Sequence, residues 1–358
     1  MSQEELLYTI ALNILYRNKI IKELALLDRY GSALEVCRHE NLNGLDEALV
    51  VARKEVEWIE EHKIDCLYYK DTEKYPYRLA QCPDLPVMLY TKGNVELNKG
   101  HFISVVGTRT ATAYGKDMAA GIVKDLAAAV PNLTIVSGLA YGIDITAHKA
   151  ALEAGIPTIA VLGHGLDRIY PALHRNYAIA TLEKGGLVTE YTSGNTPEGY
   201  NFIARDRIIA GLSDCTLVVE SAARGGSLLT AHMAFDYNRD VFAVPGRMTD
   251  EHSKGCNNLI KLQKAFLVTA ADDIINYMNW DTRTPQTVQT EIEDLFTDLN
   301  EEEKKILHFL RAAEDGAHIN QIIIEVQLDY ATVSSTLMML ELKDLIKGLP
   351  GGMYRAVR

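Results

Sequence analysis

The chain has 358 residues, more than one hydrophobic core usually covers, so we expect two or three domains. Its net charge of −12 argues against a broad basic surface for nucleic acid, although a local basic pocket on an acidic body is still compatible with it. The N-terminus, MSQEELLYTI, is too acidic for a signal peptide, and no apolar run approaches the roughly 18 residues of a membrane span. The five cysteines form no CxxC pair, which indicates reduced thiols. We therefore predict a cytoplasmic protein with no membrane contact.

The first segment, residues 1–65, is predicted to consist of short helices. Apolar residues recur at helical spacing between Leu6 and Leu15, and Asp28–Gly31 has the composition of a turn. We interpret the segment as a small helical domain of the SAM or helix-hairpin type. A role in packing is favoured over a role in nucleic-acid binding.

Residues 66–280 are predicted to form a Rossmann-like core, entered through a proline-containing connector. Short apolar runs alternate with helical patterns, which is typical of βαβ units and of a mostly parallel sheet with helices on both faces. The predicted strands are 87–90, 102–106, 133–137, 158–162, 187–189, 215–220 and 241–244. The predicted helices are 113–130, 143–154, 173–184, 202–212 and 227–238.

The last segment is predicted to be a separate winged-helix-like domain, residues 293–358. Residues 281–292 are polar and contain a proline, as a linker does. Three helical patterns follow, and the chain ends in two strand-like runs around a Pro-Gly-Gly turn, a hairpin signal. The fold class is therefore α/β, with a helical domain before the core and a winged-helix-like domain after it.

The most informative local pattern is a strand, a glycine loop and a helix. The apolar strand 215–220 leads through Arg224 into Gly225 and Gly226, and a helix is predicted to open at Ser227. Such a helix start points backbone N–H groups and a positive dipole end at a phosphate, and the glycines allow a close approach. Because no acidic catalytic pair and no metal-ligand pattern accompanies the loop, we predict phosphate binding without cleavage, with no catalytic residue, metal or cofactor.

A second group of unusual residues ends the strand 102–106, namely Gly107, Thr108 and Arg109. Ligands of such sheets bind beyond the carboxyl ends of the strands. Arg109 would project there and contact a phosphate. In the alternative interpretation it pairs with a nearby carboxylate, such as Asp144.

One predicted helix in the core carries an aromatic residue and a cation on one face, Phe202 and Arg205. Such a pair can stack on a base and neutralise a phosphate. Alternatively, Phe202 packs into the core, and Arg205 or Arg207 pairs with Asp206 or Glu198. The residues by themselves leave both interpretations open.

Other motifs are weaker. Residues 163–168, GHGLDR, half-match a dinucleotide-binding fingerprint, but the third glycine is absent and Tyr170-Pro171 interrupts the helix that should follow. No GxxxxGK[ST] sequence occurs, so a P-loop nucleotidase is not predicted. His174, shortly after the Tyr-Pro pair, is a candidate hydrogen-bond donor.

Several runs, in order, resemble the DNA-processing protein A (DprA, also called Smf) family over roughly residues 70–275. The resemblance implies a Rossmann-like core that binds single-stranded DNA and dimerises. It also implies a role in natural transformation and recombination, in which members load the RecA recombinase onto incoming strands; members are not known as enzymes. The runs are GTRTATAYG, SGLAYGIDITAHKAAL, TIAVLGHGLDRIYPALHRNYA, RDRIIAGLSDCTLVVESAARGGSLLTAHMA, VFAVPG and HSKGCNNLI.

The resemblance also assigns residues to the DNA pocket. In one position this chain departs from several relatives, which have a basic residue directly after the Tyr-Pro pair, where Ala172 stands here. Arg175, about one turn further on, is the candidate substitute. The full predicted DNA-binding set is Gly107, Thr108, Arg109, Ser137, Gly138, Tyr170, His174, Arg175, Phe202, Arg205, Arg207, Arg224, Gly225, Gly226 and Ser227.

The competing hypothesis is a nucleotide-processing enzyme on a related scaffold, such as a nucleoside-monophosphate phosphoribohydrolase. Such enzymes need a catalytic Glu one turn after the glycine loop. No Glu occurs in residues 227–238, and Asp236 is the one acid there. We therefore predict a protein that is not an enzyme.

Two further expectations concern assembly and the C-terminal segment. An apolar cluster near the end of the core, Leu259, Ile260, Leu262 and Phe266, is a candidate surface for a homodimer. Residues 291–358 hold 7 bases and 13 acids, a net charge of −6. The winged-helix-like domain is therefore not expected to be the main DNA-binding element.

Overall fold

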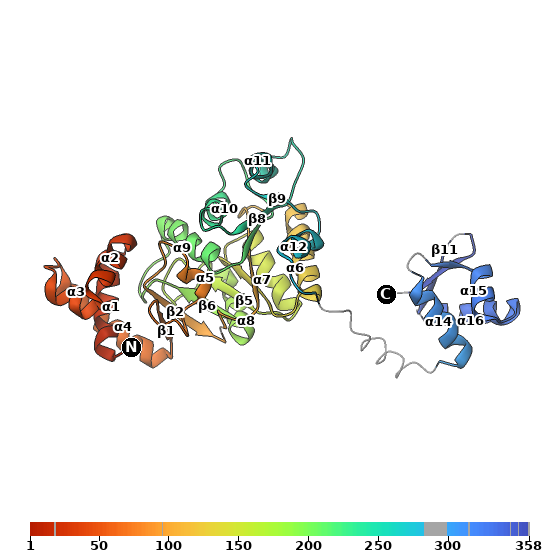
Figure 1. The fold of residues 1–358 in the computed structure, drawn as a ribbon, viewed down its shortest axis with the longest axis horizontal. Coiled ribbons are helices and arrows are strands. Elements are labelled where there is room, and N and C mark those ends of the chain that lie inside the picture. The colour runs from red at the N-terminus through yellow and green to blue at the C-terminus, as the bar shows by residue number, and fades with distance from the viewer. Residues whose placement is uncertain are drawn as a thin grey trace. The chain divides into compact units, whose positions relative to one another are not determined.

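The structure is a computed structural model that describes residues 1–17, 19–94, 96–282, 299–313, 316–343, 345–349 and 351–356. The chain divides into two compact units, Met1–Thr284 and Pro285–Arg358 (Figure 1). The predicted linker lies outside the described residues from residue 283 onward. Within the part of the chain that is described, no helix has the length and apolar character needed to cross a bilayer.

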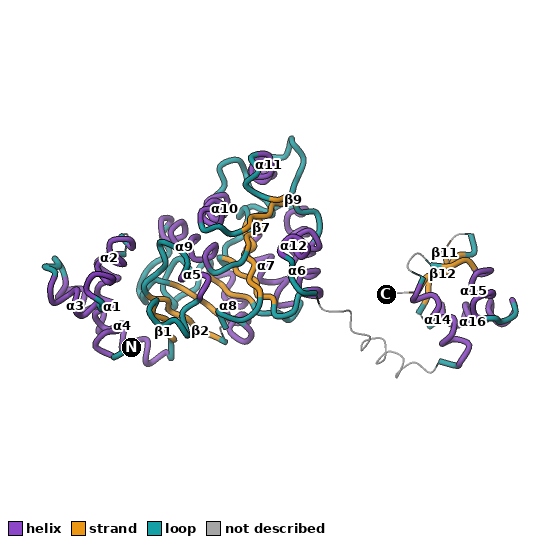
Figure 2. The backbone as a smooth tube through the Cα atoms, in the orientation of Figure 1, coloured by secondary structure: helices purple, strands orange, loops and turns teal. Residues whose placement is uncertain are grey.

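The first unit is built on a sheet that contains, among the described residues, nine strands in the order β1-β2-β6-β5-β4-β3-β7-β8-β9 (orange in Figure 2). Six neighbouring pairs are parallel, and only β1/β2 and β2/β6 are antiparallel, which confirms the predicted mostly parallel sheet. The strands are β1 (Asp65–Tyr68), β2 (Met88–Gly93), β3 (His101–Val106), β4 (Leu133–Ser137), β5 (Thr158–Val161), β6 (Gly186–Thr189), β7 (Cys215–Val218), β8 (Asp240–Ala243) and β9 (Phe266–Leu267).

Seven strands agree with the predicted ones within about three residues, and the two that the sequence did not predict are β1 and β9. Both lie at an edge of the sheet, and they are four and two residues long. Such short strands show too little alternation of apolar and polar residues to be recognised. β7 ends two residues before the predicted end, which leaves Glu220 in the loop that follows.

Helices cover both faces of the sheet because side chains of each strand point alternately to opposite faces. On one face Ile103 and Val105 of β3 pack with α6, α7 and α12; on the other Phe102 and Val106 pack with α5, α9, α10 and α11. The helix α8 packs beside α7 over β5 and β6. The helices are α5 (Tyr77–Ala80), α6 (Ala113–Ala129), α7 (Ile143–Glu153), α8 (Arg175–Lys184), α9 (Gly199–Gly211), α10 (Ser227–Asp236), α11 (Lys254–Lys261) and α12 (Ala271–Met278).

The N-terminal segment is helical, as expected, and it packs on the β1–β2 edge of the sheet. Ile10 and Ala52 share a buried cluster with Met88 and Tyr90 of β2. The helices end at His62, just before β1, but because they share this core with the sheet, an independent domain 1–65 stays a prediction. The helices are α1 (Gln3–Tyr16), α2 (Ile20–Tyr30), α3 (Ala33–His39) and α4 (Leu45–His62).

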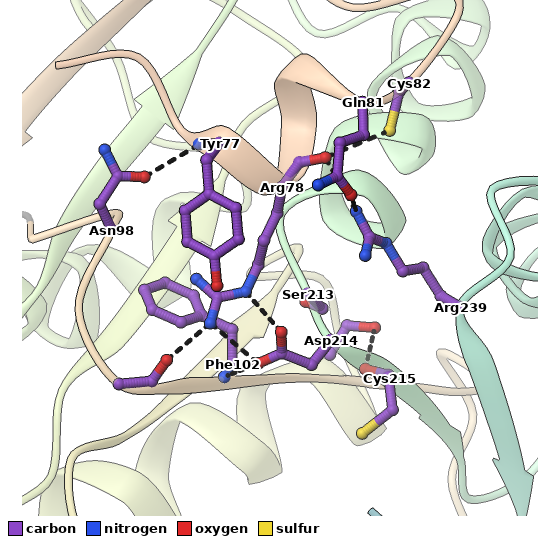
Figure 3. Close-up of polar contacts among 12 residues, drawn as sticks. Tyr77, Arg78, Gln81, Cys82, Asn98, Phe102, Ser213, Asp214, Cys215 and Arg239 are labelled. Carbon is purple, nitrogen blue, oxygen red and sulfur yellow. Dashed lines mark hydrogen bonds and ion pairs between the residues drawn. The ribbon is translucent and has the colours of Figure 1, made fainter. Parts of the chain in front are cut away.

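The connector between these helices and the core is fastened by a buried ion pair (Figure 3). Arg78 of α5 is 2% exposed, and its Nε lies 2.6 Å from Oδ1 of Asp214, just before β7. The same guanidinium donates to the carbonyl of Gly100 and stacks between the rings of Tyr77 and Phe102. Asp214, whose side chain is 21% exposed, also accepts the backbone N–H of Phe102 with its Oδ2.

The second unit has the three helices and terminal hairpin that the sequence predicted. Asn300 caps its first helix with its side chain, and residues such as Ile306, Val333 and Leu337 form a separate core. Its three described strands form a small sheet in the order β10-β12-β11. The elements are α14 (Glu301–Ala312), β10 (Ala317–His318), α15 (Ile319–Val326), α16 (Tyr330–Leu342), β11 (Ile346–Leu349) and β12 (Met353–Ala356).

Candidate functional site

The strands β4, β3 and β7 are consecutive neighbours in the sheet, so the loops that follow them start at the same edge. The loop after β3 carries Gly107 to Arg109, and the loop after β4 begins at Gly138. The loop after β7 leads to Gly225 and Ser227. Three of the predicted motifs, far apart in the sequence, are therefore on one edge of the sheet.

An exposed cation and two aromatic rings form the most prominent contact at this edge. The guanidinium of Arg109 lies 5.4 Å from the ring centre of Phe202, and the ring of Tyr170 lies 5.6 Å from Phe202 on α9. Phe202 is half-buried, whereas Arg109 and Tyr170 are exposed. A ligand would thus meet Arg109 and Tyr170 first, with Phe202 supporting both. Within the described residues Arg109 makes no ion pair, and Asp144, its predicted alternative partner, instead accepts the backbone N–H of Gly138.

Arg205 lies beneath this surface. It is 3% exposed and donates to the carbonyls of Gly138 and Val161, at the ends of β4 and β5. It also pairs with Asp206 at 3.1 Å, which is one of the pairings expected from the sequence. A Cβ atom at Gly138 would lie 2.6 Å from this guanidinium, so the close approach requires glycine. Arg205 therefore holds two strand ends and the helix α9 together.

Two buried carboxyl groups accompany Arg205. Burial raises the pKa of Asp144 to about 6, and the charge of Arg205 partly opposes that rise. Burial also raises the pKa of Asp206, opposed mainly by Arg205 and more weakly by Arg109. These acids lie below the surface, whereas the charge of Arg109 is exposed to solvent.

Glu220 fixes the loop that carries Arg109, and sequence reasoning missed it. Its backbone carbonyl accepts the N–H of Thr108 at 2.8 Å. Its carboxylate accepts the N–H of Thr112 at 2.9 Å and the Thr112 hydroxyl at 2.5 Å. An acid at the end of an apolar strand was the available signal, but the sequence does not show which loop it holds.

The glycine loop after β7 leads into a helix that begins at Ser227, as the sequence predicted. The physical reason for glycine at position 225 differs from the predicted one. A Cβ atom at Gly225 would lie 2.2 Å from Oγ of Ser221, so this residue is glycine because of its own loop. The space at Gly226 is open, and the adjacent Arg224 is exposed. Ser227 opens α10, and its side chain is buried at the start of that helix.

Four other predicted residues lie outside this exposed surface. Ser137 is buried and donates to the carbonyl of Val105, and His174 is buried with its Nδ1 2.7 Å from the carbonyl of Leu139. Arg207 is buried and pairs with Glu190, rather than with Glu198. Arg175 is exposed but lies in a different cavity, beside α4.

Two exposed tyrosines at the same edge were not predicted. Tyr141, in the loop after β4, is 45% exposed and touches the ring of His174. Tyr114, at the start of α6, is 47% exposed and donates to the carbonyl of Pro245. Both follow glycine-bearing strand ends in the sequence, which was the usable signal. Among the described residues, no group of three or more His, Cys, Asp or Glu could hold a metal ion.

Comparison with known proteins decides the family. The sequence model of the family described as DNA recombination-mediator protein A matches residues 66–279. The chain belongs to this family. A second family model, the DprA winged helix domain, matches residues 295–352.

Relatives in this family include Protein Smf of Escherichia coli, 43% identical over 211 residues, or 59% of this chain and 56% of that protein. The DNA processing protein DprA of Streptococcus pneumoniae is 42% identical over 201 residues, or 56% of this chain and 70% of that protein. The chain thus matches only a little over half the length of the first relative.

Two solved structures are also similar. The X-ray structure of DprA from Streptococcus pneumoniae superimposes with a TM-score of 0.62 and 34% identity, over 76% of this chain and 92% of that one. DNA processing protein A from Helicobacter pylori, whose structure is described for its single-stranded DNA binding mode, gives 0.54 and 28%, over 60% of this chain and 95% of that one.

Proposed function

We propose that this protein binds single-stranded DNA at the carboxyl edge of its sheet and acts as a recombination mediator. The observation that carries the proposal is the exposed surface formed by Arg109 and Tyr170 over Phe202. A cation beside an aromatic platform can neutralise a phosphate while a base stacks next to it. The Helicobacter pylori relative, described for single-stranded DNA binding, supports the same ligand here.

A single strand suits this site better than a duplex. The bases of a duplex already stack on one another, so they cannot stack on exposed aromatic rings. The bases of a single strand are free to do so. The overall charge of −12 leaves phosphate attraction to a few local cations. We therefore expect a modest salt dependence, with a log–log slope of about −0.7 for each phosphate contact.

The expected result is a clear preference for single-stranded over duplex DNA, without added nucleotide or metal. Fluorescence anisotropy with labelled oligonucleotides of one sequence, single or annealed, across a salt series measures it. Equal or tighter binding to the duplex would reject the proposed ligand.

We further propose that binding is not coupled to catalysis and that the protein serves natural transformation by loading the RecA recombinase. The glycine loop is followed by no Glu in residues 227–238, which disfavours the phosphoribohydrolase alternative. RecA loading is inferred from the family, and its test is RecA-driven strand exchange on strands coated with single-strand-binding protein. Incubation with AMP and a search for free adenine tests the alternative.

Because all five cysteines are free thiols, we place the protein in the reducing cytoplasm.

We also propose a homodimer through the β9 edge of the sheet. Leu259 of the predicted cluster is buried, but Leu262 is 65% exposed and Phe266 is 45% exposed. Leu267 and Tyr277 extend the same apolar surface beside an edge strand, which favours association. Light scattering at micromolar concentration is expected to show a dimer that Leu262→Glu dissociates, whereas Val50→Glu on α4 does not. A monomeric wild-type protein would contradict this surface as an interface.

The winged-helix unit is proposed to contact protein rather than DNA. The helix α16, in the position of a recognition helix, carries no Lys or Arg, and its Met338 and Leu342 are largely exposed. Helices that enter DNA grooves present cations or amides to phosphates and bases. Truncation after Asp281 is therefore expected to change single-strand affinity by less than about threefold, or roughly 0.7 kcal/mol. A tenfold loss in a truncated protein with unchanged melting would show that the acidic unit binds DNA.

A further inference from the structure

A hollow lies between α4 and α8, apart from the surface around Arg109. Its volume is about 530 Å³, within the range of roughly 300–1,000 Å³ that is usual for small-molecule sites. Trp58 and His62 of α4 line one side, and Arg175 of α8 lines the other. We call this hollow the α4–α8 cavity.

The charge of the α4–α8 cavity is positive. Three cations line it, Lys92, Arg168 and Arg175, against one carboxylate, Asp167, which leaves a net charge of +2 with His62 neutral. Arg168 forms an ion pair with Asp167 at 2.6 Å, which partly neutralises its charge. Lys92 donates hydrogen bonds to backbone carbonyls at the end of α4. Arg175 is exposed and makes no ion pair among the described residues. This local excess of positive charge contrasts with the negative net charge of the whole chain, and it suits the binding of a phosphate.

The cavity also offers an aromatic surface. Trp58 is half-buried and stacks on His62, with ring centres 4.6 Å apart. The chain's other tryptophan, Trp280, is 8% exposed and stacks on His101, outside the cavity. A tryptophan beside cations provides what one nucleotide needs, a stacking partner for the base and a charge for the phosphate.

One short segment of the chain joins the cavity to the proposed DNA surface. Tyr170, which contacts Phe202 there, directly follows Arg168 and Ile169, which line the cavity. Arg175 begins α8 only five residues after Tyr170. A strand that stacks on Tyr170 can therefore pass along this short segment into the cavity.

We propose that the α4–α8 cavity binds the next nucleotides of the same single strand, so that the N-terminal helical segment takes part in DNA binding. This inference rests on the proposed function. It gives a role to Arg175, which lies outside the Phe202 cluster, makes no ion pair among the described residues and lines the same cavity as Trp58.

The test uses the full chain with Trp280→Phe, so that Trp58 is the sole fluorophore of its kind, and oligothymidylates of about 6 and about 20 nucleotides. The longer strand is expected to quench Trp58, and the shorter one to bind without quenching. Arg175→Ala is expected to weaken binding of the longer strand about tenfold, the loss typical of one charge-assisted contact, and that of the shorter strand less than about twofold. Lys124→Ala on α6 removes one charge elsewhere and should change neither affinity.

If both strands bind but the longer neither quenches Trp58 nor depends on Arg175, the cavity is not a DNA site and the proposed function stands. If neither strand binds the parent protein, both proposals fail. Quenching by thymidine monophosphate that equals quenching by the longer strand would overturn the inference in favour of a site for free nucleotides.

Discussion

Replacing Arg109 by alanine is expected to weaken single-strand binding by roughly 1.5–3 kcal/mol, or about 10- to 150-fold. The side chain is exposed, stacks on Phe202 and makes no ion pair within the described residues, so its charge is available to a phosphate. The log–log salt slope should also fall by about 0.7, the contribution of one phosphate contact. Anisotropy titrations at several salt concentrations measure both quantities.

The matched control is Arg29→Ala, which removes the same charge from a side chain that is 70% exposed on α2. Its affinity should equal that of the wild type. The melting temperature of Arg109→Ala should also be unchanged, because truncating an exposed side chain opens no cavity. Wild-type affinity in a folded Arg109→Ala protein would remove this residue from the site.

Replacing Glu23 by glutamine is expected to stabilise the first unit at high pH, by roughly 2–4 kcal/mol at pH 8 relative to pH 5. Glu23 is 1% exposed, and burial, with a smaller contribution from Glu190, raises its pKa from 4.5 to about 8. Asn13 donates to its carboxyl when the amide nitrogen faces it. The folded state thus keeps a proton that the unfolded chain releases near pH 4.5.

The direction of the pH dependence of stability follows from this difference in the pKa of Glu23 between the folded and unfolded states. The favourable contribution of protonated Glu23 is complete below about pH 4.5 and is lost as the pH rises through 8, at about 1.4 kcal/mol per pH unit. Glutamine keeps the neutral shape and removes that loss. Urea unfolding followed by tryptophan fluorescence reports this unit, because Trp58 and Trp280 both lie in it. Glu61→Gln on the exposed face of α4 is the control, and parallel pH profiles for Glu23→Gln and wild type would refute a raised pKa.

The sequence by itself determined most helices and strands and the fold class. Alternating apolar runs and helical patterns are local signals, so most core strands, the parallel class and the terminal hairpin were predicted closely. Arg109 was also predicted to lie at the carboxyl edge of the sheet, because a residue placed just after a buried strand must lie at its carboxyl end. Tyr170 was predicted through the family resemblance. The motifs that mark the family are contiguous runs and needed no structure.

Only the tertiary structure decided which residues meet. Arg205 and Arg109 looked alike as candidate cations, yet Arg205 is buried on strand carbonyls while Arg109 is exposed. Glu220 holds the Arg109 loop from 108 residues away, and Arg78 pairs with Asp214 across 136 residues. Periodicity shows which side of an element faces inward, but not the partner that a polar group finds there. That partner depends on how separate segments pack, because burial makes charged groups pair with whatever the fold brings near.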